Sequence, residues 1–199
     1  MAIAINGNGT VTGVSVGGLP DGIVDTDMIA TEAVTSPKIG NGGIIQVVQG
    51  IKTDTFSTAA ALSTKATITG LTVNITPISS SNKILIIMQL GVVGATADTT
   101  VGGTILRDST AIGLADAAEL RTQNTFGCGV PATGSDWRTH NVSFTILDSP
   151  ATTSQITYSV KIGGNGSQTV TINYDERNTD SATDATRSSS TITAIEVVA

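Results

Sequence analysis

Apolar residues recur at every fifth position through the first part of the chain, a spacing that matches no common secondary structure. From Gly18 to Ile45 the sequence reads GLPDGIVDTDMIATEAVTSPKIGNGGII. An α-helix repeats its buried face about every 3.6 residues and a strand every second residue, so neither would gather these side chains on one side. The series consists of Val14, Leu19, Val24, Ile29, Val34, Ile39 and Ile44.

Short extended steps separated by turns would bring such side chains together, and Pro20, Gly22, Pro37 and Gly40 supply the breaks. Burying one aliphatic side chain contributes about 1.5–3 kcal/mol, whereas ordering each residue costs about 1–2 kcal/mol of backbone entropy. The segment is therefore too poor in apolar residues to fold alone. We expect identical copies of residues 1–43 to wind around a shared axis as a stalk. Chance spacing in an apolar-rich linker is the alternative.

From Ile44 onward the pattern changes to that of short strands. The run KILIIMQLGVVG (83–94) is almost wholly apolar, which predicts a strand buried on both faces. Alternation of apolar and polar residues predicts half-buried strands at 139–148, 154–162 and 168–174. Further strands are expected at 44–51, 66–70, 71–78, 102–115 (as a hairpin) and 190–198. The fold class predicted is all-β, with the stalk followed by a β-sandwich or jelly-roll domain over 44–199.

Two segments between these strands are expected to be long loops, 115–137 and 175–190. The second is polar, and loops on a rigid β-scaffold are common places for recognition. Its candidate surface-recognition residues are Asp175, Arg177, Asn178, Asp180 and Arg187. A plain solvated loop is the alternative.

Composition narrows the class of partner. The 199 residues carry a net charge of -6, and binding to nucleic acid or to an anionic membrane surface needs clustered positive charge. No apolar run is long enough to cross a bilayer, and the first residues do not resemble a secretion signal. We expect a chain made in a cytoplasm, without membrane insertion. The single cysteine, Cys128, excludes an internal disulfide.

Candidate chemistry is sparse. One histidine, His140, and one cysteine cannot form a usual zinc site or a catalytic triad, so we expect no catalytic residue, no metal and no cofactor. The acidic stretches at 25–27 and 175–180 contain oxygen ligands but do not match a calcium loop. A glycoside hydrolase would need two carboxylates at a set separation in space, which a sequence does not specify.

Several phrases occur in an order typical of one group of viral proteins. They are GLPDGIVDTDMIATEAVTSPKI, IIQVVQGIKTDTFST, GLTVNITPISSSNKILI, GGTILRDSTAIG, ILDSPATTSQITYSVKI and RSSSTITAIEV. With these phrases the chain resembles the fibre-type virion proteins of tailed bacteriophages, notably marine and cyanobacterial phages. The resemblance covers most of the chain from Gly18 to the C-terminus and includes no catalytic signature.

The resemblance implies a structural virion protein and not an enzyme. It implies a homotrimer whose N-terminus engages another virion protein, a capsid or tail component, and whose β-domain faces outward. Adhesion to a host-surface glycan is a separate hypothesis that is compatible with this role. The chain has a short stalk and no long shaft, so a capsid decoration or head fibre is the alternative to a tail fibre. An isolated carbohydrate-binding module is a third interpretation.

Overall fold

The computed structural model describes residues 4–5, 11–12, 34, 38, 40–95, 99–130, 139–166, 168–175, 183 and 185–199. The chain divides into two compact units, Met1–Gly40 and Asn41–Ala199. In the first unit, β1 (Ala4–Ile5) pairs antiparallel with β2 (Val11–Thr12). Of the predicted stalk, residues 1–43, only 4–5, 11–12, 34, 38 and 40–43 are described, so most of that prediction lies outside the described residues.

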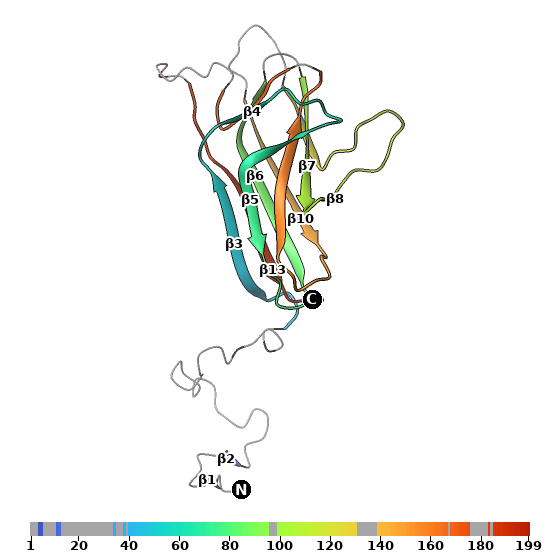
Figure 1. The fold of residues 1–199 in the computed structure, drawn as a ribbon. Helices are drawn as coiled ribbons and strands as arrows, with labels where there is room; N and C mark the ends of the chain where they lie inside the picture. The colour runs from blue at the N-terminus through green and yellow to red at the C-terminus, as the bar shows by residue number, and fades with distance from the viewer. Residues whose placement is uncertain are drawn as a thin grey trace. The chain divides into compact units, whose positions relative to one another are not determined.

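The first sheet of the second unit contains six strands. Five of them follow the order β3-β13-β6-β12-β4, and the sixth, β10, also pairs with β6. Figure 1 labels β3, β4, β6, β10 and β13 of this sheet. Its strands are β3 (Ile44–Lys52), β4 (Phe56–Thr58), β6 (Lys83–Ala95), β10 (His140–Asp148), β12 (Val170–Ile172) and β13 (Ser190–Val197). The longest strand, β6, pairs with three others, and it therefore forms the middle of the sheet.

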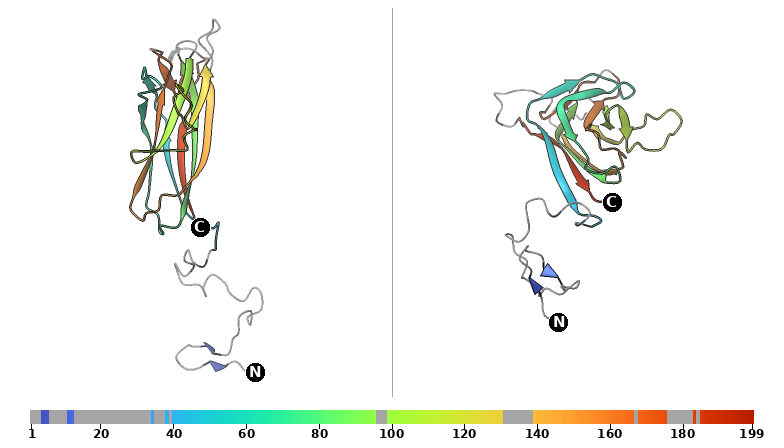
Figure 2. Two further views of the ribbon diagram at one scale, coloured as in Figure 1. Left: turned by 90° about the vertical axis from the view of Figure 1, so that its right-hand side faces the viewer. Right: turned by 60° about the horizontal axis from the view of Figure 1, so that its bottom comes forward.

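The second sheet contains five strands in the order β5-β11-β7-β8, with β9 also paired to β7. Its strands are β5 (Ala66–Ile75), β7 (Thr99–Arg107), β8 (Thr110–Ile112), β9 (Phe126–Val130) and β11 (Ile156–Gly163). Strands of the two sheets run along a similar direction, as the left view of Figure 2 shows. The orders β3-β13-β6-β10 and β5-β11-β7-β9 are those of a jelly roll, so the predicted all-β sandwich is confirmed.

The core lies between the sheets and is built from alternate residues of each strand. Ile86, Met88 and Ile192 of the first sheet and Leu71 and Tyr158 of the second are fully buried. All five belong to one apolar cluster. Because every second side chain of a strand points to the same face, the alternation seen in the sequence places these residues inward.

Two predictions of burial were wrong. The run 83–94 is not buried on both faces, since only its final part, 90–94, is buried at every position. Before it, Ile87 is exposed and Leu85 half-buried, because the outer side of the first sheet is not covered in a single chain. Conversely, residues 170–173 are buried throughout and not half-buried.

The predicted loop 115–137 contains a strand, β9, and the prediction is wrong over those residues. Phe126 of β9 pairs with Gly103 of β7, and its ring occupies the space where a side chain at 103 would lie. Gly127 and Gly129 lower the strand propensity of the segment, so the sequence pattern does not predict strand β9.

Candidate interaction surface

Four neighbouring strands of the first sheet present aliphatic side chains away from the core. Leu147 of β10 pairs with Leu85 of β6, Leu85 pairs with Ile195 of β13, and Ile195 pairs with Val47 of β3. Directly paired residues point to the same side of a sheet, so these four form one row across it. We define the aliphatic face as this row together with Ile44, Ile51, Ile87 and Val197.

The aliphatic face is open to solvent in the single chain. The exposed fractions of its most accessible residues are Ile44 60%, Val47 57%, Ile51 58%, Ile87 39% and Leu147 51%. Among the outward-facing positions of β3, β13, β6 and β10, only Lys83 is charged. The acidic residues of these strands, Asp148 and Glu196, are buried on the inner side. The face is therefore apolar and almost free of charge.

The outer side of the second sheet has the opposite character. Its exposed positions on β5 are Thr67, Thr69, Thr72 and Asn74, and Lys161 of β11 is half-buried beside Thr67. Hydroxyl and amide groups keep their hydrogen bonds to water at such positions, whereas aliphatic groups do not. One sandwich thus carries one ordinary solvent-facing side and one side that resembles an interface.

The ends of the second unit differ in what they carry. At one end the start of β3 lies against the end of β13: the Gly42 nitrogen donates to the Val198 oxygen at 2.8 Å, and the Val198 nitrogen donates to the Gly43 oxygen at 2.9 Å. The N-terminal unit is joined covalently at this end, and the C-terminus lies there too (Figure 1). Strands β6 and β9 end at the opposite pole, where β13 begins.

The two ends of the predicted recognition loop are held together at that opposite pole. Tyr174 and Arg187 form a bridge, and the guanidinium of Arg187 lies 5.7 Å from the centre of the Tyr174 ring, within cation–π distance. Asp175 is buried, and its Oδ2 accepts a hydrogen bond of 3.1 Å from the Thr186 nitrogen. Arg177, Asn178 and Asp180 lie outside the described residues. The structure therefore brings together Asp175 and Arg187 of the five candidates.

Of the seven predicted stalk residues, the structure describes Val34 and Ile44, which are 55% and 60% exposed. The other five lie outside the described residues. Exposure in one chain does not test the stalk, because identical chains would supply the surface that covers it. Ile44, the last member of the series, is also the first residue of β3 and part of the aliphatic face.

Asp148, at the end of β10, joins the two sheets through a buried polar cluster. It accepts hydrogen bonds from Arg107 Nη1 at 2.8 and 3.0 Å and from the Tyr158 hydroxyl at 2.7 Å. Burial, the hydrogen bond to Asp148 and the charge of Asp148 all raise the pKa of the Tyr158 phenol. Every member has a partner, which is typical of a structural cluster.

Glu196 is a second buried carboxylate, on the inner side of β13. Its oxygens accept hydrogen bonds from Gln46 Nε2 at 2.5 Å, Asn82 Nδ2 at 2.7 Å and the Ile78 nitrogen at 2.8 Å. These donors come from β3 and from the β5–β6 connection, so the carboxylate ties three segments together beneath the aliphatic face. With its hydrogen bonds satisfied within the domain, it serves packing.

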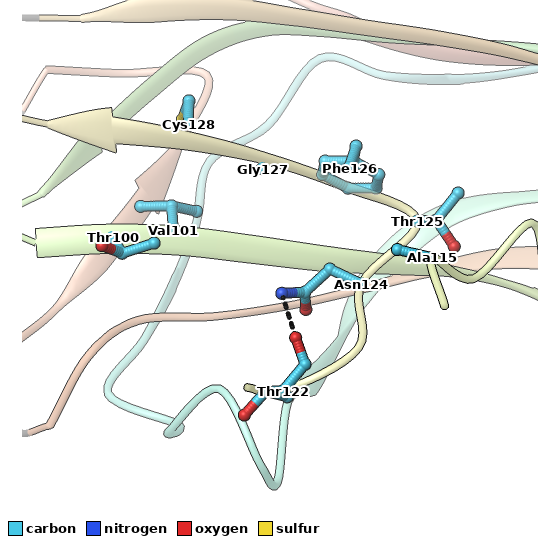
Figure 3. Close-up of a pocket in the computed structure, with 9 residues that line it drawn as sticks. All are labelled: Thr100, Val101, Ala115, Thr122, Asn124, Thr125, Phe126, Gly127 and Cys128. Atoms are coloured by element: carbon cyan, nitrogen blue, oxygen red, sulfur yellow. Dashed lines mark hydrogen bonds between the residues drawn. The ribbon is translucent and has the colours of Figure 1, made fainter. Parts of the chain in front are cut away.

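A pocket of about 490 Å³ lies beside β7 and β9 (Figure 3). Its lining is uncharged and consists of Thr100, Val101, Ala115, Thr122, Asn124, Thr125, Phe126, Gly127 and Cys128. Asn124 Nδ2 donates to the Thr122 oxygen at 3.1 Å. Burial raises the pKa of the Cys128 thiol, which keeps it protonated and weakly nucleophilic at neutral pH.

Other chemistry is limited in the part of the chain that the structure describes. No three His, Cys, Asp or Glu side chains are grouped there in a way that could hold a metal ion. His140 is half-buried at the start of β10, and its Nε2 has no hydrogen-bond partner among those residues. No helix within the described ranges is long and apolar enough to cross a membrane.

Comparison with known proteins identifies no family. No protein-family model matches the chain, and no curated protein matches it. Three similar solved structures come from infectious bursal disease virus. The structure of strain Gx has 18% sequence identity and a TM-score of 0.37. The T=1 particles derived from infectious bursal virus have 14% identity and a TM-score of 0.39, and a VP2 subviral particle has 17% identity and a TM-score of 0.36. Each match covers 77% of this chain, but the chain spans only 36%, 40% and 37% of those proteins, respectively.

A likeness of this degree fixes neither family nor function, so the function has to be argued from the chain's own surfaces. Sequence reasoning did not identify the aliphatic face, although signals for it were present. The segment 44–51 and the apolar run 83–94 contain apolar residues at both inward and outward positions. Strand pairing, which the sequence does not give, was needed to show that the outward ones share one face.

Proposed function

We propose that this protein is a structural virion appendage of a tailed phage. In this proposal it is a homotrimeric fibre whose N-terminal unit docks on another virion protein, and the jelly-roll domain projects outward. The particle component is either a tail protein or a capsid protein. The resemblance to phage fibre proteins and the fifth-residue series of the N-terminal segment support the proposal.

The observation that carries the proposal is that the two ends of the jelly roll bear different features. The covalent connection to the N-terminal unit lies at one pole, where Gly42 and Val198 are hydrogen-bonded. The C-terminus lies at the same pole. The neck of the polar loop, closed by Tyr174 and Arg187, lies at the other. A domain tethered at one end and carrying its loops at the other suits a projecting appendage, since such loops meet whatever the particle approaches.

Adhesion to a host-surface glycan is the outward half of the proposal. Arg187 and the polar residues of 175–187 offer hydrogen-bond donors and acceptors on a neck anchored by the buried Asp175. A glycan-binding screen of the trimer and of an Arg187→Ser variant tests this half. Specific binding that the variant loses is the expected result, and binding that is absent from the unmodified protein would contradict adhesion while leaving the architectural role intact.

An electron cryo-microscopy reconstruction of the intact particle tests the architectural role. The expected density is a three-fold appendage with the Gly42–Val198 pole nearest the particle and the Tyr174–Arg187 pole farthest away. Location on the tail or the head then separates a tail fibre from a capsid decoration. Density with the poles reversed, or a particle that lacks the protein, would contradict the proposal.

A further inference from the structure

We infer that the aliphatic face is a contact surface for second copies of this chain, so that the jelly rolls meet around the axis of the stalk. This inference rests on the proposed homotrimer and names the part of the β-domain that forms it. The occupant is another copy of the same face and not a different protein.

The size of the face fits such a contact. Its five most exposed residues present roughly 500 Å² of mainly apolar surface, at the upper end of the largest patch on ordinary monomers. A standard interface buries about 800 Å² on each partner, of which a little over half is apolar. The exposed aliphatic area of one face is therefore close to the apolar share of one such interface, and each chain of a trimer takes part in two.

Charge distribution also favours a copy of the chain as the occupant. Each chain carries a net charge of -6, so copies repel one another unless they meet where acidic groups are absent. The outward positions of β3, β13, β6 and β10 provide such a place, since Asp148 and Glu196 are turned into the core. The corresponding side of the second sheet, rich in threonine, shows that the fold itself does not require an aliphatic outer surface.

Continuity with the N-terminal series identifies which end of the face lies nearest the stalk. Ile44 belongs both to the fifth-residue series and to the aliphatic face, where it pairs with Val197. The aliphatic row from Leu147 to Val47 lies close to this end, and the outward residues toward the other pole include Gln49 and Gln89. Copies joined at their stalks would therefore bring the most apolar part of each face together first.

Thiol accessibility on the full-length chain tests the inference directly. In a Cys128→Ala background, Ile87→Cys places a probe on the aliphatic face and Thr72→Cys places a matched probe on the outer side of the second sheet. Both native residues are exposed in the single chain. We expect a maleimide to modify the probe at 87 at least about tenfold more slowly than the probe at 72, in a protein of trimeric mass.

Each other outcome identifies what is wrong. Equal labelling rates with a trimeric mass would overturn the inference and leave the homotrimer standing. Equal rates with a monomeric mass would overturn both. Slow labelling at 87 with a monomeric mass would mean that the chain's own N-terminal unit covers the face, which also overturns the inference. Circular dichroism confirms that each variant is folded before labelling.

A charge variant gives an independent measurement. Val47→Glu with Leu147→Glu puts two carboxylates at opposite ends of the aliphatic row, and Thr67→Glu with Thr72→Glu adds the same charge to the other outer side. We expect the first pair to shift the sedimentation coefficient toward the monomer and the second to leave it unchanged. Equal effects of the two pairs would overturn the inference.

Discussion

The hydroxyl of Tyr158 joins the two sheets at Asp148, and its removal has a stability cost that depends on pH. Tyr158 is fully buried, and its hydroxyl donates to Asp148 Oδ2 at 2.7 Å. In Tyr158→Phe the carboxylate keeps Arg107 Nη1, 2.8 and 3.0 Å from its two oxygens, so no charge is left unpaired. Loss of a hydrogen bond to a charged group costs about 1.5–3 kcal/mol, and we expect a value near the lower limit at neutral pH.

At alkaline pH this cost should decrease. The folded protein raises the pKa of the Tyr158 phenol, whereas the unfolded chain has the ordinary value of about 10. Below pH about 10 the phenol is protonated in both states and the stabilisation is complete. Above it the unfolded wild type loses the proton first, so the advantage over Tyr158→Phe falls by about 1.4 kcal/mol per pH unit. The two proteins should become equally stable near pH about 11–12.

Urea unfolding monitored by circular dichroism between neutral pH and pH about 12, at matched protein concentrations, measures the difference. Tyr174→Phe, which removes the chain's other tyrosine, controls for the loss of a phenol from the unfolded chain. A cost for Tyr158→Phe that stays constant with pH would contradict the raised pKa of the Tyr158 phenol in the folded protein. It would mean that the phenol ionises equally in the folded and unfolded states.

Three further changes test separate parts of the structure. Gly103→Ala should cost about 1–3 kcal/mol in urea unfolding, because its Cβ would lie 1.9 Å from Phe126 Cζ, whereas Gly129→Ala, with open space, should not. Glu196→Ala should cost about 3 kcal/mol in urea unfolding, since the buried amide of Asn82 and two part-buried donors lose their acceptor; a change below about 1 kcal/mol would contradict this. The triple variant Val24→Asp, Ile29→Asp and Val34→Asp should lose the trimeric mass in sedimentation but keep the circular dichroism spectrum of the β-domain; an unchanged mass would contradict the stalk.

Local pattern was sufficient to predict the fold class and most strands. The segments 44–51, 139–148 and 190–198 are rich in β-branched residues, and their strands occur close to the predicted places, as β3, β10 and β13. Strand β9 was missed because two glycines interrupt the pattern and its stability comes from Phe126 against Gly103, a contact between distant residues. Propensity describes neighbours along the chain and does not report such packing.

Interaction surfaces were harder to predict than strands. The apolar run 83–94 would have the same sequence pattern whether its outer face is covered by the chain itself or left open to solvent. The pairing of Leu85 with Ile195 and Leu147 shows that its outward residues belong to an open apolar face. The composition of 175–190 predicts a recognition loop, and the structure adds the neck formed by Tyr174 and Arg187. The fifth-residue series of the N-terminal segment stays a prediction, because its interior would be shared among chains.

Sedimentation equilibrium of the unmodified 199-residue protein measures whether the chains associate as the stalk and the aliphatic face require. We expect the mass of three 20.1-kDa chains, about 60 kDa, that persists on dilution because the stalk and the aliphatic face are both buried between copies. A mass of 20.1 kDa at every concentration would contradict it.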